Sequence, residues 1–140
     1  MTNKELLELA ALAMGFTFWR SKHGHWHGTD MNGLDFTACN NWTRFDSYSG
    51  EEYPEPSIAD ALDEYGWFPL TDDGDALRLA VKLHIGLLIE SWEAAAYAYN
   101  VAECREPAIN GDILAATRRA IVRAAAEIGK SMKEENENNT

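Results

Sequence analysis

The chain opens with apolar residues at helical spacing. They are Leu6, Leu9, Ala10 and Ala13. Thr2 and Glu5 form the Ser/Thr-x-x-Glu pattern that caps a helix start, and Gly15 is a natural stop for a helix. The sequence therefore predicts a helix over residues 3–14 with one apolar face.

Three further helices are expected along the chain. A short helix is predicted over residues 57–65, and the pattern over residues 112–132 is the most regular of all. The helix over residues 73–83 is apolar around much of its circumference, so we expect it to be largely buried. Leu77, Ala80, Val81 and His84 share one flank of this helix, with Ala76, Leu79 and Leu83 adjacent to them. Gly129 costs roughly 1 kcal/mol against alanine in a helix and is expected to mark fraying.

Runs of aromatic, β-branched or alternating residues predict short strands in two parts of the chain. The expected strands are residues 16–20, a partner starting at Trp26, residues 34–38, residues 85–91 and residues 95–103. A helix over residues 92–98 is the alternative, because alanine favours helices.

This order of elements predicts an α+β protein, with a small antiparallel sheet packed against three main helices. The chain has 140 residues, a length that fits one domain, and we expect that domain to span residues 1–132. Residues 133–140 are charged and rich in asparagine, and they are expected to form a disordered tail.

The charge is uneven along the chain. The net charge is −11, and residues 45–77 hold ten acidic residues without any lysine or arginine. One interpretation is a solvated loop with helix-capping acids, among them Asp72, Asp73 and Asp75 at the start of a helix. The other interpretation is a surface that binds a basic partner.

Composition also limits the possible partners and the compartment. The negative charge disfavours direct binding to nucleic acid, because phosphate binding needs lysine and arginine. No apolar run approaches the ~18 residues of a membrane span, and Glu5 and Glu8 interrupt the first apolar stretch, so we expect neither a membrane helix nor a signal peptide. Two cysteines, Cys39 and Cys104, fit a reducing cytoplasm, where we expect both thiols to be unpaired.

Two blocks of the sequence are distinctive: WFPLTDDGDALRLAVKL at residues 67–83 and ATRRAIVRAAAEIGK at residues 116–130. They resemble a family of small, uncharacterised proteins of tailed bacteriophages and prophages. The opening residues 4–10 are also similar, whereas residues 23–56 have no match in the family. The resemblance implies a phage accessory protein but assigns no catalytic residue. Such proteins often inhibit host enzymes, host defences or host transcription.

Chemical motifs are few. His23, His25 and His27 would share a face if they lay on a strand, which could suit zinc or nickel, although the glycines around them favour a loop without a metal. No nucleophile lies at a recognisable spacing from a base, so we expect a protein without enzymatic activity and without a cofactor. Arg119 and Arg123 lie on one side of the last helix and could hold a phosphate or carboxylate, or simply face solvent.

These observations favour a phage-encoded inhibitor that binds a basic host protein through its acidic surface. A CRISPR effector complex, a restriction enzyme or another DNA-binding host factor would fit as the target. The candidate partner-binding residues are Asp46, Tyr48, Glu51, Glu52, Tyr53, Glu55, Asp60, Asp63 and Glu64. Two alternatives remain: a nucleotide or small-molecule sponge that uses Arg119 and Arg123, and a structural or regulatory protein that acts as a homo-oligomer.

Overall fold

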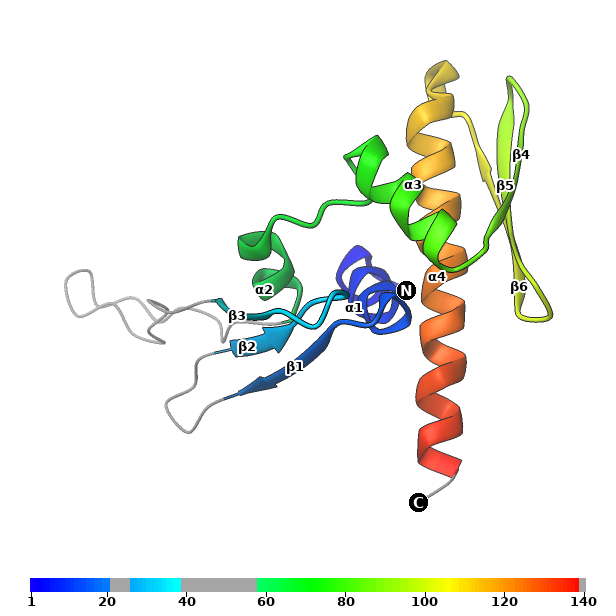
Figure 1. Ribbon diagram of the computed structural model, residues 1–140. Helices are drawn as coiled ribbons and strands as arrows, with labels where there is room; N and C mark the ends of the chain where they lie inside the picture. Colours follow the sequence, from blue (N-terminus) through cyan, green and yellow to red (C-terminus); the bar gives the residue numbers. More distant parts are fainter. Residues whose placement is uncertain (21–25, 39–57, 139–140) are drawn as a thin grey trace. The chain divides into compact units, whose positions relative to one another are not determined.

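The computed structural model describes residues 1–20, 26–38 and 58–138. The chain divides into two compact units (Figure 1). Unit 1 consists of Met1–Gly15 and Phe68–Thr140, and unit 2 is Phe16–Trp67. The predicted α+β fold class is confirmed, but the strands of the described residues form two three-stranded antiparallel sheets, one in each unit.

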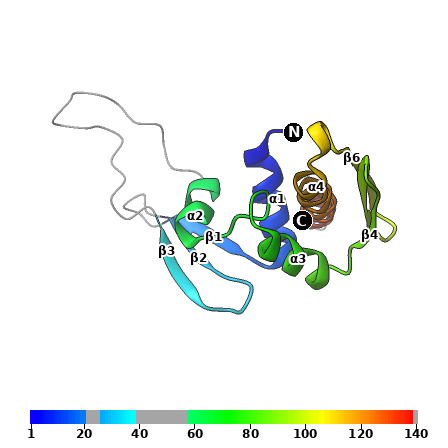
Figure 2. The same ribbon diagram turned by 90° about the horizontal axis from the view of Figure 1, so that it is seen from above.

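Unit 1 is built around its last helix. Its elements are α1 (Asn3–Met14), α3 (Asp73–Lys82), β4 (Gly86–Ile89), β5 (Glu93–Ala98), β6 (Ala102–Pro107), the short 3₁₀ helix η1 (Ile109–Gly111) and α4 (Ile113–Asn138). The view along α4 shows α1 on one side of this helix and the sheet on the other, with α3 between them (Figure 2). The capping box of Thr2 and Glu5 starts α1, and Gly15 ends it with a φ of 104°.

Small residues let α4 approach its neighbours closely. Its buried residues include Ala120, Ala124, Ala125 and Ala126, and β5 faces it with buried alanines as well. Gly129 is buried where α4 meets α1, and a Cβ atom there would lie 1.9 Å from the carbonyl oxygen of Leu9. Gly129 is therefore a packing residue, and the expectation that it marks fraying was wrong.

The helix α3 buries less of its surface than the sequence indicated. Ala76, Leu79 and Ala80 are buried, but Leu77 is 58% exposed and Val81 is 66% exposed. Residues at i, i+3 and i+4 form one narrow stripe, and that stripe suffices to pack against α4. His84 lies beyond the helix, exposed, with a φ of 55°. The expected burial was therefore wrong for Leu77, Val81 and His84.

The sheet of unit 1 is a meander with the order β4-β5-β6. β5 occupies Glu93–Ala98, so the helical alternative over residues 92–98 is excluded. The strand predicted over residues 95–103 is in fact a hairpin, since Asn100 takes a left-handed conformation, with a φ of 57°, and reverses the chain there. Asparagine tolerates this conformation better than most residues, a signal that the alternation of Tyr97 and Val101 obscured.

The last helix is longer than predicted. It continues to Asn138, six residues past Met132, into the stretch expected to be disordered. Residues 132–138 are exposed, so this end of α4 is a solvated helix made largely of good helix formers.

In the part of unit 2 that the structure describes, a meander is combined with one short helix. Its elements are β1 (Thr17–Arg20), β2 (Trp26–Thr29), β3 (Asp35–Ala38) and α2 (Ile58–Tyr65), and the sheet order is β1-β2-β3. Phe16 is buried, and its ring contacts those of Tyr65 and Trp67, each with a centroid separation of 5.3 Å. This aromatic cluster joins the start of the unit to its end.

Candidate functional site

The acidic stretch of residues 45–77 is divided between the two units. Asp60, Asp63 and Glu64 lie on α2 in unit 2, whereas Asp72, Asp73 and Asp75 lie at the start of α3 in unit 1. The other candidate partner-binding residues lie outside the described residues: Asp46, Tyr48, Glu51, Glu52, Tyr53 and Glu55.

The three acids at the start of α3 have structural roles. The Asp72 carboxylate accepts a hydrogen bond from the Asp75 backbone N–H at 2.8 Å and so caps the helix. Asp75 accepts from the Phe68 N–H at 2.9 Å and pairs with Arg78 at 2.7 Å. The hydrogen bond to Asp75 raises the pKa of Arg78 above its usual value. These contacts agree with the interpretation that the acids at the start of α3 cap the helix.

Asp73 makes its contact with the last helix. Its Oδ1 atom lies 2.6 Å from a guanidinium nitrogen of Arg118, which also donates to the carbonyl oxygen of Leu70 at 2.9 Å. Arg118 therefore ties α4 to the connection that leads into α3.

Arg119 and Arg123 meet the same carboxylate. Glu106 on β6 lies 2.7 Å from Arg123 and 3.5 Å from Arg119. Arg123 also donates to the carbonyl oxygen of Arg105 at 3.0 Å, and Arg119 donates to the Asn3 side chain at 2.8 Å. Both guanidinium groups are thus engaged in packing α4 against its neighbours, which leaves the anion-binding hypothesis without support from their geometry.

A second ion-pair group covers the outer face of the sheet, away from α4. Arg105 contacts Glu93 at 2.5 Å, Glu103 at 2.6 Å and the Tyr97 hydroxyl at 3.3 Å. The hydrogen bonds to Glu103 and then Glu93 raise the pKa of Arg105. Ala95 is only 1% exposed on this face, and its register partner on β6 is Arg105.

The histidine motif is only partly described. His23 and His25 lie outside the described residues, and the His27 ring stacks on Trp19 with centroids 4.3 Å apart. Among the described residues, no group of three histidine, cysteine or acidic side chains is placed to hold a metal ion. Asp30, which follows this motif in the sequence, is buried and accepts hydrogen bonds from the N–H groups of Asn32 and Leu34 and from the Tyr65 hydroxyl.

Cys104 is buried on β6. Burial raises the pKa of its thiol, which reduces the thiolate fraction at neutral pH and therefore its nucleophilicity. Cys39 lies outside the described residues.

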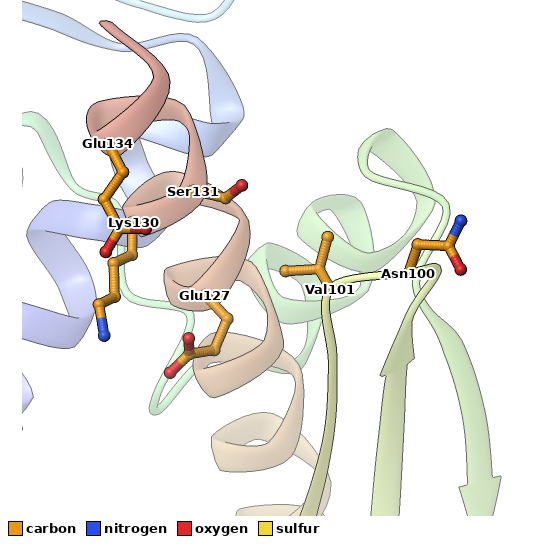
Figure 3. A pocket seen from close by; sticks show the side chains of 6 residues that line it. All are labelled: Asn100, Val101, Glu127, Lys130, Ser131 and Glu134. Carbon is orange, nitrogen blue, oxygen red and sulfur yellow. The ribbon is translucent and has the colours of Figure 1, made fainter. Parts of the chain in front are cut away.

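A shallow depression lies between the β5–β6 turn and the second half of α4. Its lining residues are Asn100, Val101, Glu127, Lys130, Ser131 and Glu134. Figure 3 shows Asn100 and Val101 on the turn and the other four along α4. The depression is open and mostly polar, and its walls come from one helix face and one turn, which gives little enclosure for a small ligand.

Large apolar side chains are exposed along β4. Leu87, Leu88 and Ile89 are 37%, 46% and 54% exposed, and Trp92 in the following turn is 63% exposed. Within the described part of the chain, β4 pairs with β5 on one side only, so it is an edge strand. This exposed edge was not expected from the sequence, although the Gly-Leu-Leu-Ile run close to a tryptophan is a signal for it.

Comparison of the chain with protein-family models, with curated proteins and with solved structures gives no match. In the described ranges, no helix combines the length and the apolar character that crossing a lipid bilayer requires.

Proposed function

We propose that this chain is a non-enzymatic protein that binds a basic surface of a host protein and inhibits it, with the contact residues in unit 2. The observation that supports the proposal is the different balance of charge in the two units. Unit 2 has nine acidic residues against three basic ones, whereas unit 1 has fourteen against nine and pairs each of its arginines with its own carboxylates.

The pairing in unit 1 involves all five of its arginines. Each lies within 4 Å of a carboxylate of the same unit: Arg78, Arg105, Arg118, Arg119 and Arg123. Unit 2 holds nine acidic residues against three basic ones. Its carboxylates therefore outnumber the cations that the same unit can offer them, and a partner rich in lysine and arginine would supply the missing charge.

The contact would be made by acids with aromatic residues among them. Every candidate partner-binding residue of the sequence analysis, from Asp46 to Glu64, belongs to unit 2. Carboxylates in such a surface can take the places of nucleic-acid phosphates in a basic groove, and Tyr48 and Tyr53 would add apolar contact area. The acids of α3 are not part of this surface, since capping and Arg78 or Arg118 occupy them.

The nature of the partner follows from the resemblance to small phage proteins. It implies a target in the cytoplasm of a bacterial host, and a CRISPR effector or another DNA-binding factor has the basic surface that the charge requires. This assignment of compartment and target is part of the proposal.

The experiment is affinity capture of host proteins on the immobilised full chain, followed by a binding titration with the captured protein. Replacing Glu51, Glu52 and Glu55 by glutamine should weaken binding at least about tenfold at low salt. Binding of the unaltered chain should also weaken as salt rises, because salt screens surface charge.

A matched control separates a defined site from net charge alone. Glu134, Glu135 and Glu137 lie on the exposed end of α4, and replacing these three by glutamine changes the net charge by the same amount. The proposal requires that this control bind as well as the unaltered chain. Equal weakening by both sets, or no weakening by the first, would refute it.

A further inference from the structure

We propose that β4 is a self-association site, at which two copies of the chain pair their β4 strands antiparallel and join their three-stranded sheets into one of six strands. This inference is independent of the proposed function, which rests on unit 2. It starts from the difference between the two edges of the sheet in unit 1.

One edge carries the features that discourage pairing with another strand. β6 has the charged residues Glu103, Arg105 and Glu106 and ends at Pro107, which lacks an N–H group. Charged side chains and proline at an edge are common protections against unwanted strand pairing. β4, with the sequence Gly-Leu-Leu-Ile, has neither.

The backbone of β4 has its unpaired groups at two defined residues. The Glu90 N–H donates to the Glu93 carbonyl at 2.9 Å, so the peptide groups of Glu90 point toward β5. Because these groups alternate along an antiparallel strand, those of Leu88 also point toward β5, and those of Leu87 and Ile89 point away from it. Leu87 and Ile89 therefore offer one N–H and one C=O each at the edge.

This spacing is complementary to itself. When two β4 strands run antiparallel around a twofold axis at Leu88, Leu87 of each copy faces Ile89 of the other. Each of these two pairs exchanges two hydrogen bonds, which makes four. The two Leu88 residues then form the close, non-hydrogen-bonded pair at the axis, with Cα atoms about 4.5 Å apart.

Charge also favours a second copy at this edge. The chain has a net charge of −11, so most of its surface repels another copy, but β4 contains no charged residue. In the register centred on Leu88, Glu90 of one copy faces Gly86 of the other, and no like charges meet. Pairing would also cover the exposed apolar side chains of Leu87, Leu88 and Ile89.

The first test measures the mass of the full chain by sedimentation equilibrium over a range of concentrations. We expect a dimer whose dissociation constant rises about tenfold or more in Leu88→Lys, since the two lysines would face each other at the axis. Val101→Lys is the control, because Val101 is 44% exposed, close to the 46% of Leu88, but lies at the β5–β6 turn. A strict monomer, or a dimer that both variants weaken equally, would overturn the proposal.

The second test does not depend on how well Leu88→Lys folds. In a chain with Cys39 replaced by serine, Leu88→Cys should form a disulfide-linked dimer under mild oxidation, because the Cα separation at the axis permits that bond. Val101→Cys in the same background should remain largely uncrosslinked. Crosslinking of Val101→Cys as fast as Leu88→Cys would contradict the placement of the axis, and so would a failure of Leu88→Cys to crosslink.

Discussion

The Tyr65 hydroxyl donates a hydrogen bond to Oδ2 of Asp30 at 2.9 Å and so fastens the end of α2 to the turn between β2 and β3. The other oxygen of Asp30 accepts from the N–H groups of Leu34 and Asn32, each at 2.9 Å. Asp30 is 6% exposed, so its charge is stabilised by these three donors in place of water.

The stability of unit 2 should therefore fall in acid. The hydrogen bond from Leu34 is the largest influence on the pKa of Asp30 and lowers it below the usual 3.8, while burial opposes it and the bonds from Tyr65 and Asn32 reinforce it. A carboxyl group whose pKa is lower in the folded chain than in the unfolded chain stabilises the fold at pH values above its unfolded pKa. This contribution is lost as the pH falls through the folded pKa. We expect the urea midpoint of the unaltered chain to fall toward that of Asp30→Asn as the pH drops from about 7 to about 3.

Tryptophan fluorescence is a suitable measurement for this titration, since four of the five tryptophans belong to unit 2. Tyr65→Phe is the control, because it keeps both backbone donors to Asp30 and should keep most of the pH dependence. If the urea midpoints of the unaltered chain and of Asp30→Asn differed by the same amount at every pH, this explanation would be contradicted.

Gly129→Ala should destabilise unit 1 although alanine is the better helix former. The gain in helix propensity is about 1 kcal/mol. The added Cβ would lie 1.9 Å from the Leu9 carbonyl oxygen, which is backbone and can move only with α1. Overpacking costs about 1 to 3 kcal/mol and sometimes more, and a clash with backbone belongs at the upper end of that range. After the gain in propensity is subtracted, we expect a net loss of about 2 kcal/mol in the free energy of unfolding.

Gly74→Ala gives the matched comparison in denaturant unfolding monitored by circular dichroism. Gly74 is also helical, but the atoms nearest to its added Cβ would be side-chain ends of Arg78 and Asp72, the closest at 3.2 Å. It should change stability by less than about 0.5 kcal/mol or raise it slightly. Equal changes in the free energy of unfolding for the two variants would contradict the close approach of α1 and α4 at Gly129.

Arg118→Ala should cost more than Arg78→Ala. The side chain of Arg118 is 17% exposed and contacts the Leu70 carbonyl as well as Asp73, whereas that of Arg78 is 65% exposed. We expect a loss of about 1 to 2 kcal/mol for Arg118→Ala, as for a charged donor at a partly buried site. Exposed ion pairs contribute about 0 to 1 kcal/mol, so Arg78→Ala should lie near the lower end of that range. Thermal unfolding of both variants measures the difference, and equal losses would contradict it.

Cys104 should resist alkylation in the folded chain. Burial limits the access of the reagent to its sulfur. Burial also raises the pKa of its thiol, so the fraction of reactive thiolate at neutral pH is small. Mass spectrometry of the peptide that carries Cys104, after timed treatment with iodoacetamide, should show little modification until denaturant is added. Rapid labelling without denaturant would show that β6 separates from α4 readily.

Local signals in the sequence predicted the elements with their own start and stop residues. Thr2, Glu5 and Gly15 marked α1 correctly. Thr71 and Asp72 were the two candidate caps at the start of α3, and Asp72 is the cap, because capping depends on neighbours in the chain. The division of the strands between two sheets depends on pairing between distant segments, which a local pattern does not encode.

The surface was harder to predict than the elements. Leu77 and Val81 belong to an apolar pattern and are nonetheless exposed, since only the stripe of Ala76, Leu79 and Ala80 faces α4. The acids of α3 could be assigned to capping from the sequence, but their pairing with Arg118 could not, because 45 residues separate Asp73 from that arginine. The proposed role of the acids in unit 2 stays a prediction.

The discontinuous make-up of unit 1 has a consequence for synthesis on the ribosome. Met1–Gly15 emerges first, but α1 packs on α4, which emerges last. The 52 residues between Gly15 and Phe68 form unit 2, which is continuous in sequence. All residues of this unit have therefore emerged before α4 is synthesised. During translation, unit 2 can therefore fold before α1 can pack on α4. A product truncated before α4 would contain unit 2, but its α1 would remain exposed.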